Sequence, residues 1–233
     1  MKTVGFIGAY DKTDLILYIS KILTSMGKKV LMIDTTTMQK AKYTIPSMLP
    51  SKSYVTEFEG IDVAVGIYSY ESIKRYFGIP EQEPLKYDYI LIDVDSIDSM
   101  ESFDIKNANQ NYFVSGFDTF SIRKGLEIIK DIFEPIKLKK IFFSKNITKE
   151  EDDYFNYLAL GSKAIWDDEQ IYFPFESGDQ TFIIENQMAS KIKFKKFTEL
   201  YKESLIYIVE ELMDNKQEEA LVRKTFKQLE KGV

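Results

Sequence analysis

Short apolar runs of strand type alternate along this chain with longer segments of helical periodicity, and this alternation constrains the fold more than any other feature. In 13–26 the apolar residues recur at helical spacing, and Gly27 follows where a glycine commonly ends a helix. Strands that alternate with helices form a mostly parallel, twisted sheet flanked by helices, an α/β fold. The expected strands are 3–7, 29–33, 54–58, 61–67, 89–92, 111–115, 140–144 and 170–173. The expected helices are 13–26, 69–77, 120–133, 148–160 and most of 194–229.

The length of the chain favours one domain. Its 233 residues, 44% of them hydrophobic, suffice for one large core, and no internal repeat or long linker divides them. We therefore expect a single α/β domain over 1–233, with a C-terminal helical tail from about residue 194. The side chains expected to be buried in its strands are Leu31, Ile33, Ile90, Ile92, Phe113 and Phe142.

The composition excludes several kinds of chemistry. The chain has neither cysteine nor histidine, which removes disulfides, thiolate metal sites and the Ser-His and Cys-His catalytic pairs. Catalysis would have to use carboxylates, lysine, hydroxyls, backbone dipoles or a magnesium ion held by oxygen ligands. A net charge of −6 argues against strong nonspecific DNA binding. No apolar run is long enough to cross a bilayer or to act as a signal peptide, so the expected location is the cytoplasm.

The most informative segment is IGAYDKT, residues 7–13, which lies between the first strand and the first helix. A phosphate site needs a tight loop of backbone N–H groups, a helix N-terminus, a lysine and a Ser/Thr for magnesium. Gly8, Lys12 and Thr13 supply three of these parts in order, while Phe6 and Asp11 stand where the ordinary P-loop has glycines. From the residues alone, a simple turn before a helix that starts with Lys-Thr remains an equal alternative.

The order of motifs along the chain resembles the ParA/MinD family of P-loop ATPases, in the SIMIBI class. The loop is similar to the deviant Walker A motif, KGGxxK[ST]. The second strand ends in Asp34 (MIDTTT), and YDYILID, ending in Asp93, is similar to the Walker B strand of the family. Asn146 (FFSKN) and 172–176 (YFPFE) stand where the family has an adenine-reading Asn and a proline-containing loop over the base.

The resemblance implies a nucleotide site at one edge of the sheet. The residues implied to contact ATP or ADP are Gly8, Ala9, Tyr10, Asp11, Lys12, Thr13, Asn146, Pro174 and Glu176, and those implied to hold Mg²⁺ are Thr13, Asp34 and Asp93. Asp34 and Asp93 are also the candidate catalytic residues if the protein is active. The alternative is that Asp34, Asp93, Asn146 and Pro174 are ordinary turn residues and that Asp11 only caps a helix.

Four departures from the family pattern indicate weak or absent hydrolysis. Ile7 replaces the signature lysine and cannot neutralise phosphate charge. Ala9 adds a Cβ where the backbone should approach phosphate, and Asp11 places a carboxylate in an anion site. Thr36 replaces the second acidic residue. Binding of nucleotide and Mg²⁺ is accordingly expected to be weak or lost.

The last predicted helix has an apolar face with basic residues around it. Five basic and three acidic side chains lie in 216–233. Some MinD relatives end in a basic amphipathic helix that lies on membranes. Packing of this helix on the domain or on a partner is the expectation we favour over membrane contact. Its apolar face consists of Leu221, Val222, Thr225, Phe226 and Leu229.

These features together predict a degenerate ATP-binding protein, a pseudo-ATPase, that acts as a dimerising scaffold or localisation factor for a larger bacterial machinery. TadZ-type and CpaE-type pilus-assembly proteins are the comparison that the resemblance suggests, with recruitment to the membrane or cell pole by partners. A homodimer is expected through Tyr10, Asp11, 35–39 and 95–100, or alternatively through the helices from residue 194 onward. Two other functions remain open: an active ATPase of the same fold, and a Rossmann-like interaction domain without a nucleotide.

Overall fold

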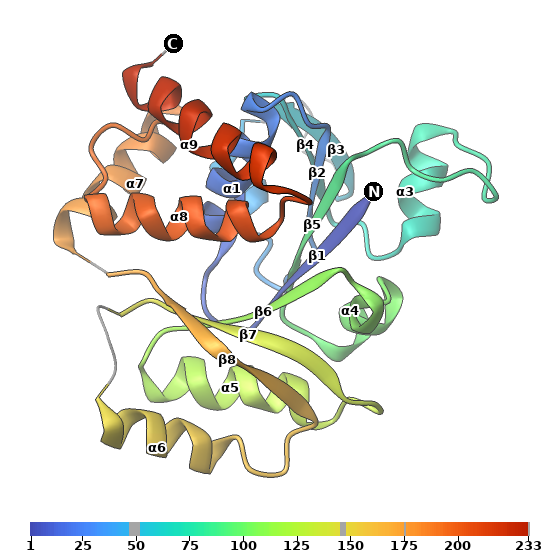
Figure 1. The fold of residues 1–233 in the computed structure, drawn as a ribbon. Helices are drawn as coiled ribbons and strands as arrows, with labels where there is room; N and C mark the ends of the chain where they lie inside the picture. Colours follow the sequence, from blue (N-terminus) through green and yellow to red (C-terminus); the bar gives the residue numbers. More distant parts are fainter. Residues whose placement is uncertain (47–51, 145–147, 175, 233) are drawn as a thin grey trace.

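One eight-stranded sheet organises the protein (Figure 1). The computed structural model describes residues 1–46, 52–144, 148–174 and 176–232. The strand order is β3-β4-β2-β5-β1-β6-β7-β8, and every neighbouring pair is parallel except the β3–β4 hairpin, which confirms the predicted sheet. The strands are β1 Lys2–Ile7, β2 Val30–Asp34, β3 Tyr54–Phe58, β4 Ile61–Val65, β5 Tyr89–Val94, β6 Gln110–Ser115, β7 Ile136–Phe142 and β8 Ala164–Tyr172.

Helices cover both faces of the sheet. Helices α1, α8 and α9 share one hydrophobic cluster with one face, and α3 to α6 share a second cluster with the other face (Figure 1). The six strand residues predicted to be buried are all fully buried. The helices are α1 Thr13–Ser25, α2 Ala41–Thr44, α3 Tyr70–Phe77, α4 Ile97–Ser102, α5 Thr119–Lys130, α6 Lys149–Leu158, α7 Ser177–Ala189, α8 Glu199–Glu211 and α9 Lys216–Lys231, with a 3₁₀ turn η1 at Ile105–Asn107.

The strand order determines which loops meet. Strand β1 lies between β5 and β6, and β5 separates it from β2. A Rossmann sheet instead places its first two strands side by side, so the order disfavours the Rossmann-like alternative. Asp34 and Asp93 lie opposite each other in the register of β2 and β5. Because the carboxyl ends of parallel strands meet at one edge, the loops after β1, β2 and β5 come together.

Three helices and parts of two strands were not predicted, since β7 begins at Ile136 rather than at residue 140 and β8 begins before residue 170. Helices α2 and α4 are short, and α7 has apolar side chains on its exposed side, such as Ile184 and Met188, so no helical stripe marks it. Strand β8 starts at Ala164 rather than at residue 170, and its pairing with β7 is irregular between Leu138 and Lys140. The acidic residues 167–169 lie in the middle of this edge strand, and Ile165 is apolar but 52% exposed, so the sequence lacks the polar–apolar alternation typical of a half-buried strand.

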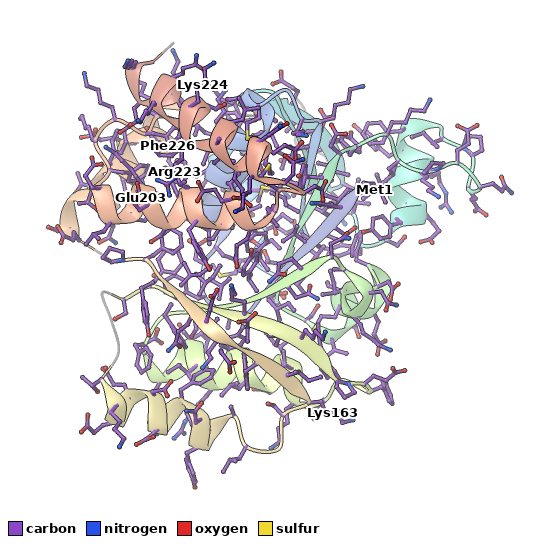
Figure 2. All side chains as sticks on the ribbon, in the orientation of Figure 1. Met1, Lys163, Glu203, Arg223, Lys224 and Phe226 are labelled. Atoms are coloured by element: carbon purple, nitrogen blue, oxygen red, sulfur yellow. The ribbon has the colours of Figure 1, made fainter. Side chains whose placement is uncertain are left out.

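The C-terminal helices pack on the domain. Val222 and Phe226 of α9 are buried in the cluster that contains α1. Arg223 of α9, which is half exposed, pairs with Glu203 of α8 (Figure 2). It also pairs with Glu210 of α8. Most of the predicted apolar face of this helix therefore packs on the domain, as we favour above, but Leu221 is 40% exposed. None of the helices in the described ranges has the length and apolar character needed to cross a membrane.

Candidate functional site

The loop after β1 requires glycine at its first position. Gly8 has φ +145°, and a Cβ there would lie 2.2 Å from the Val114 carbonyl oxygen. The Gly8 N–H donates to the Val94 carbonyl at 3.1 Å, and the chain then turns into α1 at Thr13. Within the described residues, no acceptor receives the N–H groups of Ala9, Tyr10 or Asp11. The loop therefore presents free amides beside a helix N-terminus, as an anion site requires.

Lys12 is turned inward. Its ammonium lies 2.7 Å from Asp93 Oδ1 and donates to the Gly8 carbonyl at 2.8 Å, and both ionic side chains are buried. Thr13 Oγ1 donates to Asp93 Oδ2 at 3.3 Å. Burial, only partly offset by Lys12, raises the pKa of Asp93 to about 7. Three of the sequence-predicted site residues thus meet in one buried cluster.

Asp34 is oriented differently from Asp93. Its Oδ1 accepts hydrogen bonds from the Thr36 hydroxyl at 2.6 Å and from the Thr36 N–H at 3.0 Å. Its Oδ2 accepts from the Ala41 N–H at 3.0 Å. Asp34 therefore holds the segment after β2 in place, which is the turn-capping alternative to a metal or nucleotide role.

The donor set suits magnesium only in part. Thr13 and Asp93 are in contact, and the other carboxylate oxygen of Asp93, Oδ1, is paired with the Lys12 ammonium. Magnesium commonly uses one or two protein oxygens together with nucleotide phosphates, so Thr13 and Asp93 are the residues that would hold it. Asp34 is engaged with the backbone, and no cluster of three acidic side chains suited to a metal occurs in the described part of the chain.

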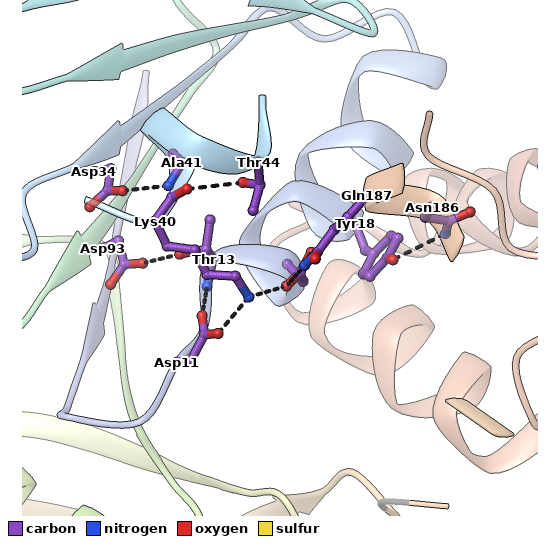
Figure 3. A network of polar contacts seen from close by, with 11 residues as sticks. Asp11, Thr13, Tyr18, Asp34, Lys40, Ala41, Thr44, Asp93, Asn186 and Gln187 are labelled. Atoms are coloured by element: carbon purple, nitrogen blue, oxygen red, sulfur yellow. Dashed lines mark hydrogen bonds and ion pairs between the residues drawn. The ribbon is translucent and has the colours of Figure 1, made fainter. Parts of the chain in front are cut away.

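Asp11 is part of a network that the sequence did not indicate (Figure 3). Its Oδ1 accepts from the Thr13 N–H at 3.2 Å, and its Oδ2 lies 2.5 Å from the Lys40 ammonium. Lys40 also pairs with Asp14 of α1 at 2.6 Å, and Gln187 of α7 donates to Asp14 at 2.9 Å. Sequence reasoning missed Lys40 because its partners lie 26 and 29 positions away.

The positions that depart from the family pattern offer no substitute charge. Ile7 is fully buried at the end of β1, opposite Val94 and Phe113. The Thr36 hydroxyl is engaged with Asp34. At these two positions the structure thus places neither a lysine near the loop nor a second carboxylate beside Asp34.

The side of the site predicted to hold the base is lined by aromatic rings. Tyr10 stacks on Phe143 with ring centroids 4.7 Å apart, and Phe143 stacks on Phe173 at 5.2 Å. Pro174 follows, buried, and Glu176 precedes α7. Asn146 lies outside the described residues. Tyr10, predicted as a dimer contact, is thus half-buried against its own domain, whereas Met38 is 81% exposed.

Comparison with known proteins defines the fold. Neither the protein-family models nor the curated proteins match the sequence. The chain is similar in structure to MinD in the MinC:MinD cell division complex of Aquifex aeolicus, at 16% identity over 92% of this chain and 97% of that chain (TM-score 0.57). It is similar to a plasmid partition protein of Borrelia burgdorferi bound to AMPPNP, at 13% identity over 91% and 99% (TM-score 0.56).

A ParA family ATPase of Chlorobium tepidum is a third similar structure, at 15% identity over 92% of this chain and 98% of that one (TM-score 0.53). At these identities the likeness concerns the fold. The chain has the ParA/MinD-like P-loop fold, as its motifs predicted.

Proposed function

We propose that the chain is a ParA/MinD-like nucleotide-binding protein with little or no ATP turnover, acting as a dimerising scaffold or localisation factor in a larger assembly. One observation carries the proposal: the residues expected to bind phosphate lie together, while the two positions expected to support hydrolysis carry no charge. Lys12, Thr13 and Asp93 meet behind a loop with open amides. Ile7 and Thr36 provide neither the lysine nor the acid of the family.

The similar structures support nucleotide binding and partner binding as the class of function. The Borrelia protein is described with AMPPNP bound, and the Aquifex MinD is described in complex with MinC. A domain of the same fold that binds nucleotide without turning it over would retain a fixed surface for a partner.

Binding and turnover separate the proposed function from its alternatives. Calorimetric titration with Mg-ATP should give a measurable affinity, while steady-state phosphate release should stay near the assay background. Hydrolysis at rates typical of partition ATPases would establish the active-ATPase alternative. Folded protein that binds neither ATP nor ADP at millimolar concentration would remove the nucleotide role.

Restoring the loop is a second test. Asp11→Gly together with Thr36→Asp should tighten nucleotide binding or raise turnover, because the first frees the contacts that the Asp11 carboxylate occupies and the second returns an acid to the segment after β2. Ile7 is left unchanged, since a lysine at this fully buried position would lack a carboxylate partner.

Light scattering at micromolar protein, with and without Mg-ATP, tests the dimer. The proposal requires a dimer in at least one condition. A strict monomer in both would leave a monomeric adaptor. The exposed Met38 side chain provides a variant, since Met38→Asp should weaken a dimer formed through the loops after β1 and β2.

A further inference from the structure

Lys40 follows β2, yet its ammonium lies at the phosphate loop. It forms ion pairs with Asp11 of the loop at 2.5 Å and with Asp14 of α1 at 2.6 Å (Figure 3). Burial opposes the charge on Lys40, but the two carboxylates outweigh it and raise the pKa of Lys40. A permanent positive charge is therefore held at the loop by the segment after β2.

The contacts of Asp11 are those of a bound anion. One carboxylate oxygen accepts the Thr13 N–H at the start of α1, and the other accepts the Lys40 ammonium. A backbone N–H at a helix N-terminus and a nearby ammonium are the groups with which proteins bind phosphate oxygens. In the free protein, the Asp11 carboxylate thus has contacts that a phosphate group would use.

The loop otherwise lacks an outward-facing cation. Lys12 is directed to Asp93 and the Gly8 carbonyl, and Ile7 carries no charge. Among the described residues, Lys40 is the cation outside the loop that forms an ion pair with it. A triphosphate needs more positive charge than Lys12 alone can supply.

We propose that Lys40 is the second phosphate-binding cation of this site, and that its ammonium passes from Asp11 to the terminal phosphate when a nucleoside triphosphate binds. This inference rests on the proposed function, since it requires a nucleotide in the site. Lys40 acts as a binding residue. From the segment after β2, it supplies the positive charge that Ile7, at the end of β1, does not.

The two carboxylates have different roles in this exchange. Asp14 is 15% exposed and accepts two hydrogen bonds from Gln187 of α7, so it is fixed on α1 and keeps Lys40 near the loop. Asp11 is 53% exposed and can turn to water at little cost when phosphate replaces it. Asp11 is therefore the partner that Lys40 exchanges for the ligand.

The test compares Lys40→Met with Lys42→Met, a matched lysine on α2 without an ion pair in the described residues. Calorimetric titrations with Mg-ATP and Mg-ADP would be made on both variants, on Lys12→Met and on the wild type, with folding verified by circular dichroism. Lys40→Met should weaken Mg-ATP binding by about tenfold or more, the effect of losing one charge-assisted contact. The affinity of Lys40→Met for Mg-ADP, which lacks the terminal phosphate, should fall by about threefold or less. Lys42→Met should bind both nucleotides as the wild type does.

Asp11→Asn gives an independent measurement. It should tighten Mg-ATP binding in the wild-type background, because it frees Lys40 for phosphate, and should have a much smaller effect in Lys40→Met. Equal tightening in both backgrounds would contradict the exchange of partners. The exchange would also be contradicted if Lys40→Met bound Mg-ATP as tightly as the wild type or more tightly. The Lys40–Asp11 ion pair would then oppose ligand binding.

The outcomes also separate the inference from the proposed function. If the wild type binds Mg-ATP and Lys12→Met does not, while Lys40→Met is unaffected, the inference about Lys40 fails and the proposed function stands. If neither the wild type nor Asp11→Asn binds nucleotide, both fail.

Discussion

Two lysines are buried to nearly the same degree in this protein, but their carboxylate partners differ. Lys12, after β1, pairs with Asp93, which is itself buried. Lys139, in β7, pairs with Glu169 and Glu211, which are 67% and 22% exposed. Partners that keep contact with water lose less solvation on pairing than a partner inside the core does.

The pKa shifts show the consequence. At Lys139, burial opposes the charge, but hydrogen bonds to Glu169 and Glu211 outweigh it and raise the pKa of the lysine. At Asp93, burial outweighs the attraction of Lys12 and raises the pKa of the carboxyl. The charges around Lys139 are thus well compensated, as in a structural network, whereas those around Asp93 are not. Incomplete compensation is typical of functional sites, where a ligand or metal completes the charge balance.

Introducing a buried lysine that has no carboxylate partner should have the largest effect on stability. Ile7→Lys would place an ammonium at a fully buried position beside Val94 and Phe113, so we expect a loss of about 3 kcal/mol or more. Ile7→Met, which keeps an apolar side chain, should cost less than about 1.5 kcal/mol. Urea denaturation of both variants measures the difference. Similar stabilities would mean that the end of β1 admits water more readily than its burial indicates.

Removing the well-compensated lysine should have the next largest effect. Lys139→Met leaves Glu211 without its ammonium and removes the charge beside Tyr207. We expect a loss of about 2 kcal/mol, below the full value for a buried ion pair because Glu169 is exposed. Nucleotide affinity should be unchanged. A loss smaller than that of Lys12→Met at pH 6 would reverse the comparison.

Lys12→Met should cost about 1 kcal/mol at pH 6, because Asp93 can become neutral there. The pKa of Asp93 is raised above its value in the unfolded chain, so its contribution to stability declines as pH rises and stops declining above about 7 in the wild type. Without Lys12 this pKa rises further and the decline continues. The difference in unfolding free energy between wild type and Lys12→Met should therefore be constant below pH 7. Above pH 7 it should grow by up to about 1.4 kcal/mol per pH unit.

Denaturation at pH 6, 7 and 8 measures this dependence. Lys139→Met serves as the control and should show no such change of slope, since Glu169 is 67% exposed and keeps its hydrogen bond from Tyr207 in the variant. A Lys12→Met difference that stayed constant to pH 8 would show that removing Lys12 does not change the protonation state of Asp93 in this range, which contradicts the expected rise of its pKa.

The features that could be predicted from the sequence are those that repeat locally. Periodicity gave the strands, and since parallel strands end at one edge of the sheet, Asp34 and Asp93 could be placed side by side before the fold was known. The proximity of Lys12 and Thr13 to Asp93 follows from the same geometry. The ParA/MinD-like fold was therefore predictable although no single motif is intact.

What could not be predicted depends on side chains far apart in the sequence. Nothing near Lys40 indicates that Asp11 and Asp14 will surround its ammonium. The stacking of Tyr10 on Phe143 likewise joins loops after two different strands. Asp34 was assigned to metal or nucleotide from its position at a strand end, but the direction of its carboxylate depends on where the backbone of Thr36 and Ala41 turns.

The smallest effect should come from the neighbour of Lys139. Lys140 points to the other face of β7, between the rings of Phe155 and Trp166, with its ammonium 3.9 Å from Asp152. Burial, offset only in part by Asp152, lowers the pKa of Lys140, so its charge is held less favourably than in water. Lys140→Met would keep the apolar contacts and remove that charge. We expect the free energy of unfolding to change by no more than about 0.5 kcal/mol, on the stabilising side, because the lost cation–π contacts nearly balance the relief of burial.

Urea denaturation in parallel with Lys139→Met measures this directly, since both variants make the same chemical change one residue apart in one strand. A loss at Lys140 as large as that at Lys139 would show that burial of the lysine, rather than the number and exposure of its carboxylate partners, determines what a buried ammonium contributes here.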